Sequence, residues 1–439
     1  MRLYNQGRQL ANAGQNAQAL TYFEQARDIA FLVGKRDAGA AALHDMGKCY
    51  EAQGKIDHAL AAFKESLEIF QALDHHDGAG SALVSIGVTY RVLRNWELAS
   101  SNFEEAANAY QLAGNKLQEA EALNDAAAAF NEFSQAERAL TCSDAARKIF
   151  EALGNTEGIA QVLNNQALAY QHRWKMDVAI EHFEEAIRLF RQLQKSTLVG
   201  VTLSNLGFAY YRAGRSQEAL PPLKEALAIH RTLGDRAREA AALNNMALAH
   251  SALGEPQDAL DNLNQSIVAR KAAADQVGEA RTLNNIGLIY RDLLRQPDRA
   301  LYYYEAAEKI LAGPNVNAPE AVAMVCHNIG SVLNDLGKRD EAFVYFDRSL
   351  AIKRQRKDAG GEAHTLTSMA SVLSSRGQLK EGLDCLNRAI RIEQDIGDSR
   401  GEGAALRSRG TLLLATRNTA EAYSSFEKRL PHSGVLVTA

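Results

Sequence analysis

A leucine recurs every 40 residues along most of this chain, and each copy is followed four residues later by Gly or Ala. The spacing holds for eight copies, slips once by three residues, and then resumes. The pairs are Leu3/Gly7, Leu43/Gly47, Leu83/Gly87, Leu123/Ala127, Leu163/Ala167, Leu203/Gly207, Leu243/Ala247, Leu283/Gly287, Cys326/Gly330, Leu366/Ala370 and Leu406/Gly410. A fixed period of this length is typical of repeat arrays, in which each repeat packs only against its neighbours. The sequence therefore predicts eleven structural repeats.

Each repeat carries the pattern of two helices. An aromatic residue three positions after the Gly or Ala, such as Tyr50 or Tyr210, completes one apolar face of a first helix, helix A. Alanines such as Ala59 and Ala219, followed by an apolar and then another small residue, mark a second, helix B. Only 7 of 439 residues are Pro, which favours helix throughout. We expect antiparallel helical hairpins with helices of roughly 15 to 17 residues.

Turn residues separate the predicted helices. Glycines stand where helix A ends (Gly54, Gly214, Gly254, Gly337, Gly377) and where helix B ends (Gly34, Gly114, Gly154, Gly234, Gly397), as left-handed helix caps require. Aspartates stand close to the next helix start and are predicted N-caps: Asp37, Asp77, Asp235, Asp275, Asp358 and Asp398.

The order Leu, Gly, Tyr, then Ala, Phe, Ala resembles the tetratricopeptide repeat over nearly the whole chain. The period of 40 rather than about 34, and the missing Pro near the end of helix B, resemble the long-repeat branch. That branch includes Pins/LGN-type adaptors, kinesin light chain repeats and bacterial arrays associated with proteases. The resemblance implies an all-α, right-handed superhelical solenoid of about eleven helix-turn-helix repeats.

Two departures from the 40-residue period indicate how the chain is divided. Repeat eight holds one extra residue near Gln296 and Pro297, and the link over residues 313–319 is two residues longer than the others. We therefore expect repeats one to eight in residues 1–312, an irregular seam at 313–319, repeats nine to eleven in 320–430, and a tail at 431–439.

A polar register lies on the helix A face opposite the core. Two positions after the anchor leucine every repeat carries a polar residue, and five successive copies are Asn: Asn165, Asn205, Asn245, Asn285 and Asn328. Asn is a poor helix former, so its recurrence needs a reason. Its carboxamide offers a donor and an acceptor to the backbone of an extended peptide. In the resembling families Asn at this register contacts bound peptides; the alternative is that Asn bonds the neighbouring repeat and orders the array.

An apolar stripe lies beside this register. Five positions after the anchor, repeats five to eight carry Leu168, Phe208, Leu248 and Leu288, which either meet a peptide or pack against adjacent helices. The predicted peptide-binding set also includes Tyr211, Arg212 and Arg291. The two arginines either select an acidic residue or are solvated surface charge.

Composition and motifs exclude several functions. A formal net charge of -4, without a long basic run, disfavours nucleic acid as a partner. No window is apolar enough to span a bilayer and no signal peptide is visible, so we expect a cytoplasmic protein. Four scattered cysteines suggest neither disulfides nor a zinc site. No metal ligands, cofactor motif or catalytic constellation is found, so an enzyme is not expected.

Three roles remain open. The first is a scaffold or adaptor that binds an extended peptide segment of a protein partner in the groove lined by helices A. The second is a regulatory or sensor arm of a protease or another effector enzyme. The third is a structural subunit of a large assembly. The sequence does not indicate an oligomeric state.

Overall fold

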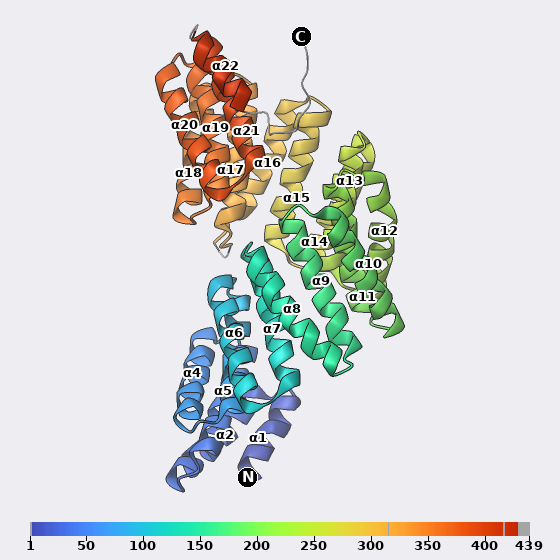
Figure 1. Ribbon diagram of the computed structural model, residues 1–439, viewed down its shortest axis with the longest axis vertical. Coiled ribbons are helices and arrows are strands. Elements are labelled where there is room, and N and C mark those ends of the chain that lie inside the picture. The colour runs from blue at the N-terminus through green and yellow to red at the C-terminus, as the bar shows by residue number, and fades with distance from the viewer. Residues whose placement is uncertain (1, 315, 416–417, 429–439) are drawn as a thin grey trace. The chain divides into compact units, whose positions relative to one another are not determined.

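The computed structural model describes residues 2–314, 316–415 and 418–428, which fold entirely into helices and their connections (Figure 1). No strand occurs among these residues, so the predicted all-α class is confirmed. The chain forms two compact units, Met1–Ile229 and His230–Ala439, and the boundary falls within helix α12. Each unit is described by itself.

The first unit consists of alternating A helices, with odd numbers, and B helices, with even numbers. They are α1 (Arg2–Asn12), α2 (Asn16–Leu32), α3 (Arg36–Ala52), α4 (Ile56–Ala72), α5 (His76–Val92), α6 (Trp96–Ala113), α7 (Lys116–Glu132), α8 (Ala136–Ala152), α9 (Thr156–His172), α10 (Met176–Gln192), α11 (Ser196–Arg212) and the greater part of α12 (Ser216–Thr232). Most of these helices have 17 residues, as the period predicts.

The second unit continues the same alternation. Its helices are α13 (Arg236–Ala252), α14 (Pro256–Ala272), α15 (Gln276–Leu288) with the π-helical turn η1 (Ile289–Leu293), α16 (Pro297–Leu311), α17 (Pro319–Asp335), α18 (Arg339–Gln355), α19 (Ala359–Ser375), α20 (Leu379–Ile396), α21 (Ser399–Ala415) and α22 (Thr419–Lys428).

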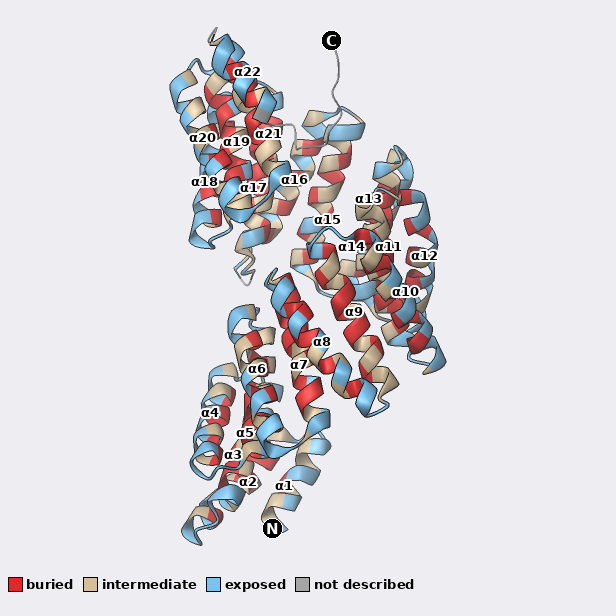
Figure 2. Cartoon of the chain, viewed as in Figure 1, coloured by how far each residue is buried: buried red, intermediate tan, exposed pale blue. Residues whose placement is uncertain are grey.

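A small residue on helix A packs against a large side chain on helix B in several hairpins, and in most of these the large side chain is a ring. A Cβ placed on Gly47 would lie 2.4 Å from a ring carbon of Phe63, and one on Gly287 would lie 2.5 Å from Tyr304. Both rings are fully buried. In Figure 2 the buried residues form stripes along the helices, while tan intermediate and pale blue exposed residues cover the rest. The repeating small residue thus sets how closely the two backbones approach.

The glycine punctuation predicted from the sequence is confirmed. All ten predicted turn glycines have positive φ, between 63° and 78°. The aspartate caps are confirmed at four helices: Asp235, Asp275, Asp358 and Asp398 each accept a backbone N–H from the first turn of the next helix.

For two helices the cap prediction was wrong by two residues. Asp37 and Asp77 lie inside the first turns of α3 and α5, and the N-cap positions are taken by Lys35 and His75. The His75 ring accepts the Gly78 N–H at 2.9 Å, so an imidazole replaces the carboxylate. A carboxylate one step inside the helix is still favoured there by the helix dipole, which is why sequence alone does not separate the two positions.

Where a turn lacks glycine, another residue adopts the same left-handed conformation. Ala274, for example, has a φ of 53° at the position held by Gly234 in the preceding repeat. We predict that Ala274→Gly raises the free energy of unfolding by about 0.5 to 1 kcal/mol, because relief of left-handed strain exceeds the entropy that glycine adds to the unfolded chain.

The neighbouring residue provides the control for this prediction. Ala273 has a φ of -87°, so Ala273→Gly gains nothing in the folded state and is expected to destabilise by about 0.5 to 1 kcal/mol. Thermal unfolding of the two variants therefore shifts in opposite directions. Equal downward shifts would show that the turn at Ala274 is not strained.

The extra residue of repeat eight is absorbed by a π-helical turn. In ordinary repeats the turn after helix A closes over five residues, as in the Lys55 N–H to Tyr50 C=O bond of 2.9 Å. In repeat eight the bond runs over six, from the Gln296 N–H to the Tyr290 C=O at 2.8 Å. The turn η1 accommodates the insertion, as single-residue insertions in helices commonly are.

The predicted seam lies within the second unit. Helix α16 ends at Leu311 and α17 begins at Pro319, so more residues separate these two helices than separate the other neighbouring helices of this unit. The division into compact units lies elsewhere, at residues 229 and 230, and the sequence did not predict it. The proposed tail, residues 431–439, lies outside the described residues. None of the described helices is long and apolar enough to span a bilayer.

Candidate functional site

The asparagine register forms a hydrogen-bonded ladder between successive A helices. In four cases the Nδ2 of the ladder Asn donates to the Oδ1 of an Asn on the preceding A helix. The bonds run from Asn165 to Asn124 (2.8 Å), from Asn205 to Asn164 (3.2 Å), from Asn285 to Asn244 (2.7 Å) and from Asn328 to Asn284 (2.7 Å). The acceptors stand one position after the anchor leucine and the donors two positions after it.

The ladder is divided between the two units. Asn165 and Asn205 belong to α9 and α11 of the first unit, whereas Asn245, Asn285 and Asn328 belong to α13, α15 and α17 of the second. Inter-repeat bonding, which the sequence left as an alternative to peptide contact, therefore takes up the amide nitrogen of four of the five predicted residues.

Asn165 is the most deeply engaged member. Its side chain is 7% exposed, and Nδ2 also donates to the backbone C=O of Asn124 at 3.2 Å. Asn245 is the opposite case. Its side chain is half-buried and forms no hydrogen bond within the described part of the chain. The two residues share a register position but differ in what they do for the fold.

This difference gives a prediction. Asn165→Ala leaves the buried Oδ1 of Asn124 without a donor and is expected to lower the free energy of unfolding by about 1 to 3 kcal/mol. Asn245→Ala breaks no intramolecular bond, so its expected cost is within about 0.5 kcal/mol. Hydrogen exchange measures the two costs locally: exchange in α7 to α9 reports Asn165→Ala, and exchange in α13 to α15 reports Asn245→Ala. Equal costs at the two positions would mean that the ladder bonds do not stabilise the repeats.

The amide oxygens of the ladder remain available. Within the described residues, the Oδ1 atoms of Asn165, Asn205, Asn245 and Asn328 accept no side-chain or backbone donor. Asn285 Oδ1 lies 3.5 Å from Asn284 Nδ2, at the limit of a hydrogen bond. An acceptor left open on a half-buried surface favours a ligand that brings N–H groups.

The apolar stripe is half-buried rather than exposed. Leu168, Phe208, Leu248 and Leu288 all have intermediate exposure. Leu168 and Leu288 pack in part against the cores of their own units, as the alternative interpretation anticipated. The Phe208 ring lies 6.0 Å from the Tyr211 ring on the same helix, so those two form a small aromatic surface.

The two predicted arginines are both engaged within the chain. The Arg212 guanidinium lies 4.2 Å from the centre of the Trp174 ring, a cation–π contact, and burial lowers its pKa. Arg291, in the π-helical turn, donates from Nε to Asp335 on α17 at 2.7 Å. Charge pairing therefore fixes Arg291 to the next repeat and leaves it little capacity to select an acidic ligand.

Other residue types form hydrogen bonds between the same two positions of consecutive A helices as the asparagine ladder. The Tyr4 hydroxyl donates to Asp45 at 2.7 Å, and His44 Nε2 lies 2.8 Å from the Ser85 hydroxyl, again between consecutive A helices. Sequence reasoning missed these pairs because it followed one column of the repeat alignment. The signal was present in the adjacent column, where polar residues recur one position after the anchor.

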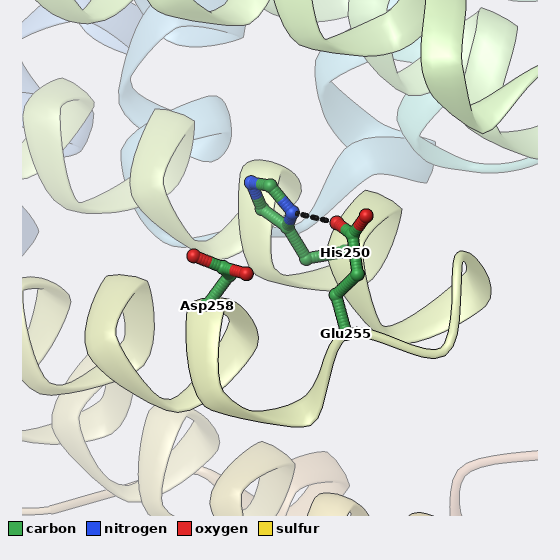
Figure 3. Close-up of side chains that lie close together, drawn as sticks. All are labelled: His250, Glu255 and Asp258. Carbon is green, nitrogen blue, oxygen red and sulfur yellow. Dashed lines mark hydrogen bonds and ion pairs between the residues drawn. The ribbon is translucent and has the colours of Figure 1, made fainter.

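One group of possible metal ligands was not predicted. His250 at the end of α13, with Glu255 and Asp258 at the start of α14, brings three ligand atoms within 4.8 Å of one another (Figure 3). His250 Nδ1 already lies 2.6 Å from a Glu255 carboxylate oxygen, and both carboxylates are exposed. A capping ion pair explains this arrangement fully, so we assign no ion to it.

Comparison with known proteins agrees with the fold. The sequence matches the tetratricopeptide repeat family over residues 1–72, 158–232, 198–272, 238–312 and 320–392. These segments cover more than half of the chain, which therefore belongs to the tetratricopeptide repeat family, a class of protein-interaction scaffolds. No curated protein matches the sequence.

Several solved structures share the fold. A Rap protein complexed with Competence and Sporulation Factor has a TM-score of 0.52 at 16% identity, over 81% of this chain and 98% of that one. The apo form of the quorum sensor NprR from B. thuringiensis has a TM-score of 0.54 at 15% identity, over 80% and 97%. A signal transduction ATPase with a tetratricopeptide repeat sensor, from Pyrococcus horikoshii, has 0.53 at 14%, over 78% and 52%. At these identities the likeness concerns the fold alone.

Proposed function

We propose that the chain is a scaffold that binds an extended peptide segment of a protein partner on the ladder face of its A helices. The observation that carries this proposal is that the two polar atoms of the ladder carboxamides have different partners. Four of the five ladder nitrogens bond the preceding repeat, while the oxygens of Asn165, Asn205, Asn245 and Asn328 accept no donor from the described residues. The inter-repeat bonds orient the carboxamides, and their oxygens can accept hydrogen bonds from a ligand.

A row of fixed acceptors suits a ligand backbone. An extended peptide presents its N–H groups alternately to opposite sides, so every second N–H meets the ladder. Because the acceptors are already oriented by their inter-repeat bonds, binding costs little side-chain entropy. On the second unit, Leu248 and Leu288 of the half-buried stripe would meet apolar side chains of a peptide, and on the first unit Leu168 and Phe208 would do the same.

The sensor role is a second candidate. The Rap protein is complexed with Competence and Sporulation Factor, NprR is described as a quorum sensor, and the ATPase from Pyrococcus horikoshii carries a tetratricopeptide repeat sensor. By likeness, a peptide bound to the ladder of this chain would act as a signal for an effector enzyme. Both candidates use the same face, so both depend on the contact tested next.

The experiment selects random 12-residue peptides on the full chain by mRNA display and measures their dissociation constants by fluorescence polarisation. Asn245→Ala is the informative variant because the Asn245 side chain makes no hydrogen bond with any residue that the structure describes. We expect it to weaken binding about tenfold, which corresponds to one lost hydrogen bond of about 1.4 kcal/mol.

The matched control is Asn262→Ala, which removes an exposed carboxamide from helix α14, away from the ladder register. This variant is expected to bind like the wild type. Selected peptides whose affinity is unchanged by Asn245→Ala, or changed equally by both variants, would overturn the ladder as the binding face.

A further inference from the structure

A second polar site lies in the second unit, where α17, α18 and α19 meet. A pocket of about 340 Å³ is lined there by His327, Asn328, Lys353, Arg356 and His364, together with two acids. The side chains of Lys353 and His327 are only 9% and 8% exposed. A polar pocket with two ionisable groups so deeply buried is unusual in a repeat array and needs an explanation.

Lys353 stands at a register position that varies along the chain. The equivalent position at the end of helix B holds a buried aromatic ring in repeats two to five (Phe70, Tyr110, Phe150, Phe190) and His230, Arg270 and Leu311 in repeats six to eight. In repeat nine an ammonium occupies it. The hydroxyl of Thr365, whose register holds Ala, Val, Thr or Arg in the other repeats, accepts the Lys353 ammonium at 2.8 Å.

The ammonium is under-satisfied. Among the described residues, the Thr365 hydroxyl is its one hydrogen-bond partner, and no carboxylate lies within 4.0 Å of Nζ. Two of its three N–H donors therefore have no partner in the part of the chain that the structure describes. Burial lowers the pKa of Lys353, since removing a lone ammonium from water disfavours its charged form.

Two histidines border the same space. The Thr365 hydroxyl donates to the Gly361 C=O at 2.9 Å, so the 3.3 Å contact with His327 Nδ1 requires that nitrogen to carry the proton. The His364 ring lies 4.6 Å from the His327 ring, at the exposed rim. Burial, with His364, Lys353 and Arg291 nearby, lowers the pKa of His327 to about 2.

The two acids that line the pocket are committed elsewhere. The Glu320 carboxylate pairs with Arg281 at 3.4 Å, and Asp358 accepts the Gly361 N–H at 2.9 Å as the cap of α19. Asp358 still attracts Lys353 through space, but it does not contact the ammonium. At the rim, Arg356 has no ion pair among the described residues.

We propose that this pocket binds a single oxyanion, a phosphate or a carboxylate, with Lys353 as its buried anchor and Arg356 and His364 at its rim. The free ammonium donors supply charge-assisted hydrogen bonds to the anion. The negative charge of the anion in turn stabilises the charged form of Lys353, which burial alone disfavours. The oxyanion is either free phosphate or an acidic group carried by a larger ligand. The site needs no peptide on the ladder, although Asn328 borders both.

The test titrates the full chain with inorganic phosphate, and separately with acetate, by calorimetry at constant ionic strength. We expect one binding site, weakened about tenfold or more in Lys353→Met, because the methionine keeps the volume but provides no donor. Lys380→Met, which removes an exposed lysine of α20, is the control and is expected to bind like the wild type.

The two anions distinguish the sources. Stronger binding of phosphate indicates a phosphate group, and stronger binding of acetate indicates an acidic side chain. A second variant, Arg356→Ala at the exposed rim, keeps the test independent of folding and is expected to weaken binding several-fold. No heat with either anion in the wild type, or unchanged binding in Lys353→Met, would overturn the site. Because no peptide is present in this experiment, neither result bears on peptide binding at the asparagine ladder, which is tested separately.

Discussion

Gly47→Val is expected to destabilise the second repeat by about 3 kcal/mol. The smallest added group, a Cβ, would lie 2.4 Å from a ring carbon of Phe63, which is fully buried and has no space to withdraw into. Valine adds two further methyl groups at the point where α3 and α4 are closest, so the helices must separate. Overpacking of this kind removes contacts along the whole hairpin.

The effect should remain local because repeat arrays couple mainly neighbouring repeats. Hydrogen exchange measured by mass spectrometry is expected to show lost protection in α3, α4 and the adjacent helices, and unchanged protection in α20 and α21. The control is Lys48→Val, at the next and exposed position of α3. It reports the helix propensity of valine and the loss of the surface pair with Asp45 at 3.5 Å, together about 1 kcal/mol or less. Similar losses in the two variants would mean that the small residue does not set the packing of the hairpin.

Glu393→Gln is expected to stabilise the end of the second unit at pH 8 and to have little effect at pH 5. Glu393 is 5% exposed, and its Oε2 has no hydrogen-bond partner among the described residues. Burial, aided by the nearby charge of Asp398, raises the pKa of this carboxyl to about 7. The folded state therefore holds a proton that the unfolded chain releases near pH 4.5.

The sign of the pH dependence follows from that difference. The stabilising contribution of protonated Glu393 is complete below about pH 4.5 and is lost as the pH rises to about 7 and above. The loss reaches up to about 3 kcal/mol, from 1.36 kcal/mol per pKa unit. Glutamine stays neutral at every pH, so the Glu393→Gln variant does not lose this stability as the pH rises.

The measurement is hydrogen exchange of α20 and α21 between pH 5 and 8, corrected for intrinsic rates, for the wild type and Glu393→Gln. Asp395→Asn removes an exposed carboxylate two residues away and is the control, with no expected change in pH dependence. A constant difference between wild type and Glu393→Gln across this range would contradict a raised pKa.

Much of the fold could be predicted because it is specified by local periodicity. The anchor Leu, the small residue four positions later and the turn glycines each reflect a contact or a backbone angle that recurs in every repeat, so eleven copies reinforce one another. The misplacement of Asp37 and Asp77 shows the limit. Two adjacent positions at a helix start both favour a carboxylate, and only the backbone path separates them.

The ladder could be predicted only in part for a different reason. The asparagine column was visible, but its partners lie 41 residues away in the neighbouring column, as in the bond from Asn205 to Asn164. Which atom of the carboxamide is used depends on how consecutive A helices stack, and a single repeat does not contain that information. The boundary within α12 and the π-helical turn also depend on packing between repeats.

The Lys353 pocket could not be predicted from the repeat pattern. In an alignment of repeats Lys353 is one deviation among many, and exposed lysines are common at helix ends. Only burial and the Thr365 contact distinguish it from a solvated side chain. Departures from a repeat pattern at buried positions are therefore the places to look for function in such arrays.

In the proposed complex, the amide oxygens of the asparagine ladder accept hydrogen bonds from the backbone N–H groups of a bound peptide. The most direct measurement is an N-methyl scan of a selected peptide, in which each backbone N–H is replaced in turn and the dissociation constant for the full chain is determined. We predict that methylation at alternating residues weakens binding about tenfold per site, and that Asn245→Ala abolishes the effect at one of them. Tolerance of methylation at every residue, with binding lost only on side-chain substitution, would contradict the account.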